Sequence, residues 1–135
     1  DNYRNLGSAL QDAGQLDEAI TWFERALEAD RQRGELEPPY NGSLALGVAL
    51  FEAGRADEAR EPLELGISGA DAPGVDVERL AEARFALARI LWEADPPARP
   101  RALALVTAAH ESWLAQGNDS ARGETEAWLA EHRVR

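Results

Sequence analysis

Histidine is the side chain with the most catalytic potential here, because the chain contains no cysteine. The two histidines are His110 and His132. Neither has a second ligand at metal-binding spacing, and neither has a nucleophile and an orienting carboxylate nearby in the sequence. His110 also occupies a position that apolar residues hold in the internal repeats described below. We therefore interpret it as a partly buried, hydrogen-bonded histidine rather than a catalytic one.

Adjacent carboxylates offer acid–base chemistry, and residues 17–18 and 57–58 are two such Asp-Glu pairs. Both pairs lie where a helix is expected to begin, a place where negative charge is favourable without any catalytic role. Asp71 and Asp76 flank a glycine but lack the alternating ligands and the terminal glutamate of a calcium loop. The sequence also lacks the Gly-Lys-Ser/Thr motif of a phosphate-binding loop. We therefore expect no metal, no cofactor and no enzymatic activity.

The charge balance narrows the classes of partner. The 135 residues include 25 acidic and 14 basic side chains, which gives a net charge of −11. Such a chain repels nucleic acid and anionic membranes. No run approaches the roughly 20 apolar residues of a membrane span, and the first residues do not resemble a signal peptide. We expect protein partners, no nucleic acid, no membrane and a cytoplasmic location.

An internal repeat with an offset of 40 residues is the strongest pattern in the sequence. Residues 6–19 contain Leu-Gly-x-Ala-Leu, a central glycine and Asp-Glu-Ala, and residues 46–59 repeat all three. A third, weaker copy begins at Leu87 and resumes at Ala102 after a two-residue insertion. A fixed offset of this size is typical of stacked helix-turn-helix units that share one core and present a binding surface.

The alternation of small and large residues has a physical reason. Small side chains allow two antiparallel helices to approach closely while large ones fill the grooves between them. The small positions in the three copies are Gly7, Gly47 and Ala88 in the first helices and Ala19, Ala59 and Ala102 in the second helices. Gly14 and Gly54 are placed to end the first helix of a pair in the left-handed conformation.

These positions resemble the pattern of a tetratricopeptide repeat. The 40-residue spacing is similar to the long-repeat branch found in kinesin light chains and in many bacterial signalling proteins. The resemblance implies an all-α, helical-hairpin solenoid of three repeats plus a capping helix. The expected helices are 2–13, 17–32, 40–53, 57–69, 76–94, 98–116 and 119–133, and Pro62 should kink or delay the fourth.

The domain boundaries follow from the repeats. We expect a single domain, 1–135, that comprises repeats 1–36, 37–74 and 75–117 and a capping helix at 118–135. The chain does not begin with methionine and starts within a repeat, so we expect it to be a fragment of a longer protein. At the N-terminal end three alternatives stay open: Tyr3 and Leu10 are partly exposed, further repeats precede them, or a second chain covers them.

The resemblance also implies a concave groove lined by the first helix of each repeat. Carried over position by position, it predicts the lining residues Arg4, Ser8, Gln11, Asp12, Leu44, Val48, Phe51, Glu52, Phe85, Arg89, Trp92 and Glu93. The alternative is that the large apolar members pack against neighbouring helices or the capping helix. Chaperone-binding members of the family clamp a terminal carboxylate, but the matching positions here are Arg4, Ser8, Ala45, Glu82 and Ala86, which argues against that clamp.

The predicted function is that of a protein-interaction module within a larger bacterial regulatory or signalling protein. Its groove, with aromatic and arginine side chains, suits an amphipathic helix or an extended apolar segment with some acidic residues. The alternative is a structural role, either self-association or docking within the parent chain.

Overall fold

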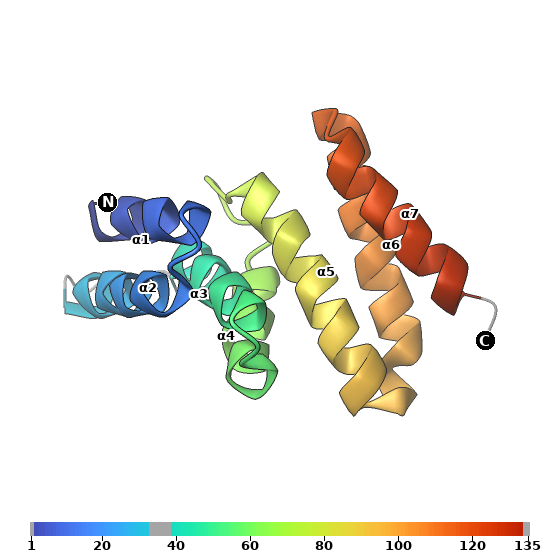
Figure 1. Ribbon diagram of the computed structural model, residues 1–135, viewed down its shortest axis with the longest axis horizontal. Coiled ribbons are helices and arrows are strands. Elements are labelled where there is room, and N and C mark those ends of the chain that lie inside the picture. The colour runs from blue at the N-terminus through green and yellow to red at the C-terminus, as the bar shows by residue number, and fades with distance from the viewer. Residues whose placement is uncertain (1, 33–38, 134–135) are drawn as a thin grey trace. The chain divides into compact units, whose positions relative to one another are not determined.

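The computed structural model describes residues 2–32 and 39–133, and every regular element in these ranges is helical (Figure 1). In chain order the elements are α1 (Asn2–Asp12), α2 (Leu16–Gln32), α3 (Tyr40–Glu52), α4 (Ala56–Ser68), α5 (Val77–Ala94), the 3₁₀ turn η1 (Pro96–Ala98), α6 (Arg99–Gln116) and α7 (Asp119–His132). The predicted helix ends agree with these bounds to within one residue, and the all-α fold is confirmed.

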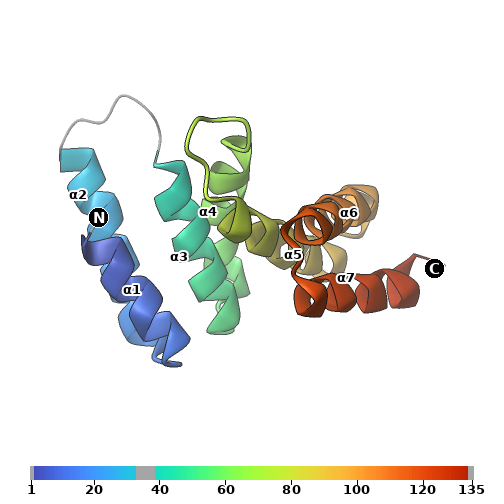
Figure 2. The same cartoon turned by 90° about the horizontal axis from the view of Figure 1, so that it is seen from above.

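The chain divides into two compact units, Asp1–Val75 and Asp76–Arg135. The boundary lies one residue from the predicted junction between the second and third repeats, and the single-domain organisation stays a prediction. Within the first unit, α1 pairs with α2 and α3 pairs with α4, as Figure 2 shows, and α2 also packs on α3. Within the second unit, α5 pairs with α6, and α7 packs on α6.

Close helix contact in the first unit depends on glycine. A Cβ atom added at Gly47 would lie 2.7 Å from Cγ and Cδ2 of Leu63 and 3.0 Å from its backbone nitrogen. The partner helix α4 makes the reciprocal contact. A Cβ atom added at Gly66 of α4 would lie 2.6 Å from Cδ2 of Leu44 in α3 and 2.9 Å from its backbone nitrogen. The α3 and α4 backbones therefore approach more closely than any larger residue would permit.

The turns within the two hairpins of the first unit are alike in atomic detail. Gly14 has φ 81° and Gly54 has φ 79°, which confirms the left-handed helix ends. The residue after each glycine donates a backbone hydrogen bond five residues back, from Gln15 to Leu10 and from Arg55 to Leu50, both at 2.9 Å. This bond satisfies a carbonyl at the helix end, so the repeat in the sequence is also a repeat of local structure.

Pro62 does not delay the fourth helix, so that part of the prediction is wrong. Helix α4 begins at Ala56 and continues through Pro62 to Ser68. More than one helical turn precedes the proline, and Ala59 and Leu63 on either side of it are fully buried. Tertiary packing therefore offsets the backbone hydrogen bond that proline removes.

Helix α7 begins at a well-formed cap. Gly117 ends α6 with φ 73°, and the Asn118 side chain then accepts a hydrogen bond from the Ala121 backbone nitrogen at 3.1 Å. Thr125 and Leu129 are the buried residues of α7. One face of α7 thus closes the second unit, and most of its other residues are exposed to solvent.

We predict that Gly47→Ala destabilises the first unit by about 1–3 kcal/mol, because the overpacking outweighs the gain of about 0.5–1 kcal/mol in helix propensity. The matched control is Gly123→Ala in α7, where an added Cβ meets nothing within 4 Å. That variant should be more stable by about 0.5–1 kcal/mol. Urea unfolding followed by circular dichroism measures both. Equal stabilities for Gly47→Ala and the wild type would contradict the close-approach argument.

We predict that Asn118→Ala lowers the stability of the second unit by about 1 kcal/mol, because the first turn of α7 loses its side-chain acceptor. Asn118→Asp keeps an acceptor at the same position and should retain most of the wild-type stability. Thermal unfolding of the three proteins checks the expectation, and equal midpoints for the alanine and aspartate variants would count against it.

Candidate functional site

The first unit brings part of the predicted groove together on α1 and α3. The side chains of Arg4, Ser8 and Gln11 on α1 and of Phe51 on α3 are half-buried. Gln11 Nε2 donates a hydrogen bond of 2.5 Å to Glu52 Oε1, which joins the two first helices across their contact. We refer to these five residues as the first-helix surface of unit 1.

Two other predicted positions on α3 are not accessible. Leu44 is fully buried against Gly66 of α4, and Val48 is 3% exposed. The sequence could not separate the groove side of α3 from its core sides, because every residue from 42 to 50 is buried. A helix that is apolar on all sides has no amphipathic pattern to orient it.

In the second unit, Phe85 and Trp92 are also buried, which corrects the expectation that they line an open groove. Both belong to an aromatic cluster that α7 covers with Trp128. The Trp128 ring centroid is 6.4 Å from that of Phe85 and 5.3 Å from that of Trp92, with edge-to-face geometry in both pairs. Trp113 of α6 meets Phe85 at 6.1 Å in the same geometry. These arrangements are favourable for aromatic rings, so the cluster contributes to the core of the unit.

Two predicted residues of α5 stay accessible: Glu93 is exposed and Arg89 is half-buried. Its guanidinium carbon lies 3.9 Å from the centroid of the Phe85 ring, and its Nε donates to the Phe85 carbonyl oxygen at 3.4 Å. The stacked geometry directs a positive charge over an aromatic face. Arg89 thus covers Phe85 from the solvent side.

A pocket of about 450 Å³ in the second unit was not predicted. It is lined by Trp92, Arg99, Glu131 and His132. Arg99 lies over the Trp92 ring at 4.7 Å and donates from Nε to the Trp92 carbonyl at 3.1 Å. His132 stacks on Trp128 at 3.9 Å, and its Nδ1 lies 2.7 Å from the Trp128 carbonyl oxygen. The Trp-x3-His spacing is the signal that could have identified this helix face.

The pocket offers binding chemistry rather than a reaction centre. A carbonyl partner requires that Nδ1 of His132 carries a proton, so a neutral ring leaves Nε2 as an acceptor. Arg99 adds cationic donors and Glu131 adds an acceptor, but the lining includes no hydroxyl or thiol for the histidine to activate.

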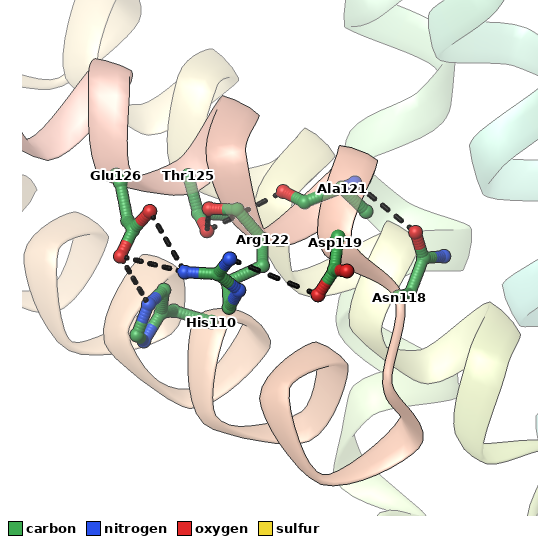
Figure 3. A network of polar contacts seen from close by, with 7 residues as sticks. All are labelled: His110, Asn118, Asp119, Ala121, Arg122, Thr125 and Glu126. Carbon is green, nitrogen blue, oxygen red and sulfur yellow. Dashed lines mark hydrogen bonds and ion pairs between the residues drawn. The ribbon is translucent and has the colours of Figure 1, made fainter.

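The other histidine links α6 to α7, as Figure 3 shows. His110 Nε2 lies 3.4 Å from Glu126 Oε2, and its side chain is 23% exposed. Arg122 Nη1 donates to both carboxylate oxygens of Glu126, at 3.1 and 3.2 Å, and Arg122 Nη2 lies 3.7 Å from Asp119. His110 is thus partly buried and hydrogen-bonded, as predicted, and its partners hold a helix rather than a substrate.

The acidic pairs occupy the first turns of α2 and α4, where the sequence placed them. Arg55 donates to both carboxylate oxygens of Glu58, at 2.7 and 2.9 Å. This hydrogen bonding lowers the pKa of Glu58 and raises the pKa of Arg55. The carboxylate is therefore ionised at neutral pH, and the small stability that this exposed pair adds is lost as the pH falls through the pKa of Glu58.

Within residues 2–32 and 39–133, no three histidine or carboxylate side chains are grouped so as to hold a metal ion. In the same ranges, no helix combines the length and the apolar composition needed to span a membrane.

Comparison with known proteins identifies the family. A family model described as tetratricopeptide repeat matches residues 1–71, while no curated protein and no solved structure matches the chain. Domains of this family bind protein partners and are typically non-catalytic scaffolds. The match covers more than half of the 135 residues and includes both helical hairpins of the first unit. The chain therefore belongs to the tetratricopeptide repeat family.

Proposed function

We propose that this domain binds a segment of a partner protein on the first-helix surface of unit 1. The observation that carries the proposal is the Gln11–Glu52 hydrogen bond, which joins α1 to α3 beside the half-exposed ring of Phe51. The bond holds side chains of two repeats on one continuous surface. A ligand that crosses from one repeat to the next would contact both.

The composition of this surface suits a peptide that carries both apolar and polar side chains. Phe51 supplies a large, rigid apolar contact of the kind that anchors protein interfaces. Ser8, Gln11 and Glu52 supply hydrogen-bonding groups, and Arg4 supplies a cation for an acidic side chain of the ligand. An amphipathic helix or an extended apolar segment with some acidic residues would use all of them.

The second unit supports the same function by separate means. Its half-exposed Arg89 and the pocket beside Trp92 provide cationic and aromatic contacts. Aromatic and arginine side chains are enriched among the residues that contribute most to binding.

The wider role follows from the family resemblance. We propose that the domain works inside a larger bacterial regulatory or signalling protein in the cytoplasm, as a scaffold without enzymatic activity. The net charge of −11 supports a protein ligand over nucleic acid.

Self-association, or docking within the parent chain, is a second candidate function. The observation that favours it is the exposure of Tyr3 and Leu6 on α1, because large apolar side chains exposed together mark interaction sites.

We predict that a photoreactive benzoylphenylalanine at position 51 cross-links a discrete host protein in lysate. The same group at Thr21, an exposed residue of α2, should not cross-link that protein, because α2 is the second helix of its repeat. Mass spectrometry of the products identifies the partner.

The purified partner then allows a quantitative test. Phe51→Arg should weaken its binding at least tenfold, about 1.4 kcal/mol, while circular dichroism shows an intact fold. Equal cross-linking from positions 51 and 21, or unchanged affinity of a folded Phe51→Arg variant, would refute the first-helix surface. Loss of helicity would instead show that Phe51 belongs to the core.

A further inference from the structure

A pocket in the second unit carries two opposite charges that do not pair with each other. The pocket, about 450 Å³ in volume, is lined by Trp92, Arg99, Glu131 and His132, and we refer to it as the Trp92 pocket. Its volume lies within the range of small-molecule sites. Among the residues that the structure describes, neither Arg99 nor Glu131 forms an ion pair. Both charges are therefore left to a bound molecule.

Arg99 is held in position on one wall of the Trp92 pocket. Its guanidinium carbon lies 4.7 Å from the centroid of the Trp92 ring, and its Nε donates to the Trp92 carbonyl oxygen at 3.1 Å. These contacts orient the guanidinium and engage Nε, while its two terminal nitrogens have no hydrogen-bond partner among the described residues. The two terminal nitrogens of an oriented guanidinium match the two oxygens of a carboxylate. This wall therefore favours a carboxylate group.

The C-terminal part of α7 supplies hydrogen-bond acceptors to the same pocket. The His132 ring stacks on Trp128, and its Nδ1 lies 2.7 Å from the Trp128 carbonyl oxygen. That partner requires a proton on Nδ1, so the neutral ring leaves Nε2 as an acceptor. Glu131 adds an exposed carboxylate. An acceptor nitrogen and a carboxylate together suit an ammonium group, which only donates hydrogen bonds.

The remaining lining of the pocket is aromatic. The His132 ring meets the Trp92 ring edge-to-face, with centroids 5.1 Å apart. Trp92 is only 9% exposed, so a small part of its ring is open to a ligand. The pocket therefore suits a small molecule, and an apolar group on that molecule would contact the rings.

We propose that the Trp92 pocket binds a free, zwitterionic α-amino acid with an apolar side chain. The carboxylate of this ligand pairs with Arg99, and its ammonium group donates to Glu131 and His132. A ligand with both charges on neighbouring atoms complements the cation and the anion of one small pocket together. A simple carboxylate would instead face Glu131, and a simple amine would face Arg99, and each of these like-charge contacts disfavours binding.

This use of the pocket goes beyond the contacts that it offers a partner protein. Its residues lie on α5, α6 and α7, whereas the first-helix surface of unit 1 lies on α1 and α3. A segment inside a protein chain carries neither an ammonium group nor a carboxylate on its backbone, because peptide bonds remove both charges. The pair of charges in the pocket therefore favours a free amino acid over a peptide.

The test compares three small molecules that share a benzyl group. At neutral pH, L-phenylalanine carries both charges, 3-phenylpropionate carries only the carboxylate, and 2-phenylethylamine carries only the ammonium group. Isothermal titration calorimetry with the purified domain measures their binding. We expect L-phenylalanine to bind with a Kd of about 1 mM or lower, and each of the other two to bind at least tenfold more weakly. Failure of L-phenylalanine to bind, or equal binding of L-phenylalanine and either analogue, would overturn the proposal.

Two substitutions assign the charges of the ligand to their partners. In Glu131→Gln, L-phenylalanine should lose most of its advantage over 3-phenylpropionate, and in Arg99→Gln it should lose most of its advantage over 2-phenylethylamine. The matched controls are Glu124→Gln on α7 and Arg101→Gln on α6, exposed residues outside the pocket lining, and both should bind as the wild type does. Circular dichroism checks that each variant is folded. Because Glu131 is exposed, a folded Glu131→Gln variant with wild-type preferences would refute the proposal by itself.

The two histidines provide an independent readout. L-Phenylalanine should shift the imidazole NMR signals of His132, which lines the pocket, but not those of His110, which contacts Glu126. Unchanged His132 signals at saturating L-phenylalanine would place the ligand elsewhere and end the proposal. Phe51→Arg should bind L-phenylalanine as the wild type does, and L-phenylalanine should not alter cross-linking from position 51. The pocket and the first-helix surface can therefore fail their tests separately.

Discussion

The contact between α3 and α4 is the constraint on which the first unit depends. Gly47 faces Leu63 and Gly66 faces Leu44, so each helix contributes one glycine and one leucine to a reciprocal contact. The distances extend to backbone nitrogen atoms, which cannot rotate away as a side chain can. This geometry sets the separation of the two helices, and the separation decides which sides of α3 remain available to α1 and α2.

Helix α1 shows how such a constraint divides one helix into surfaces with different uses. Gly7 faces the Phe23 ring of α2, where an added Cβ would lie 2.7 Å away. Gln11 lies on the side that reaches α3, and Tyr3 and Leu6 lie on an exposed side. The first of these sides packs inside the hairpin, the second reaches the next repeat, and the third is partly exposed although the Tyr3 ring contacts Trp22 of α2.

The second unit solves the same packing problem with aromatic rings in place of close glycine contacts. Trp128 of α7 lies against Phe85 and Trp92 of α5, and His132 stacks on Trp128. A pocket lined by Trp92, Arg99, Glu131 and His132 lies beside these rings. The helix that covers the aromatic cluster therefore also supplies two of the residues that line this pocket, Glu131 and His132.

Sequence alone determined the helices, their ends and the family, because local signals act within a few residues: Gly14 and Gly54 end helices, and the small residues recur at a fixed offset. It did not determine which apolar side chains face solvent. Phe51 stays half-exposed while Phe85 and Trp92 are buried, although all three occupy first helices. Burial depends on which other helix arrives at each surface, and the covering residue, Trp128, lies more than 30 positions away in the chain. Only the tertiary structure brings such distant residues into contact, so only it could decide which predicted groove positions remain open to a ligand.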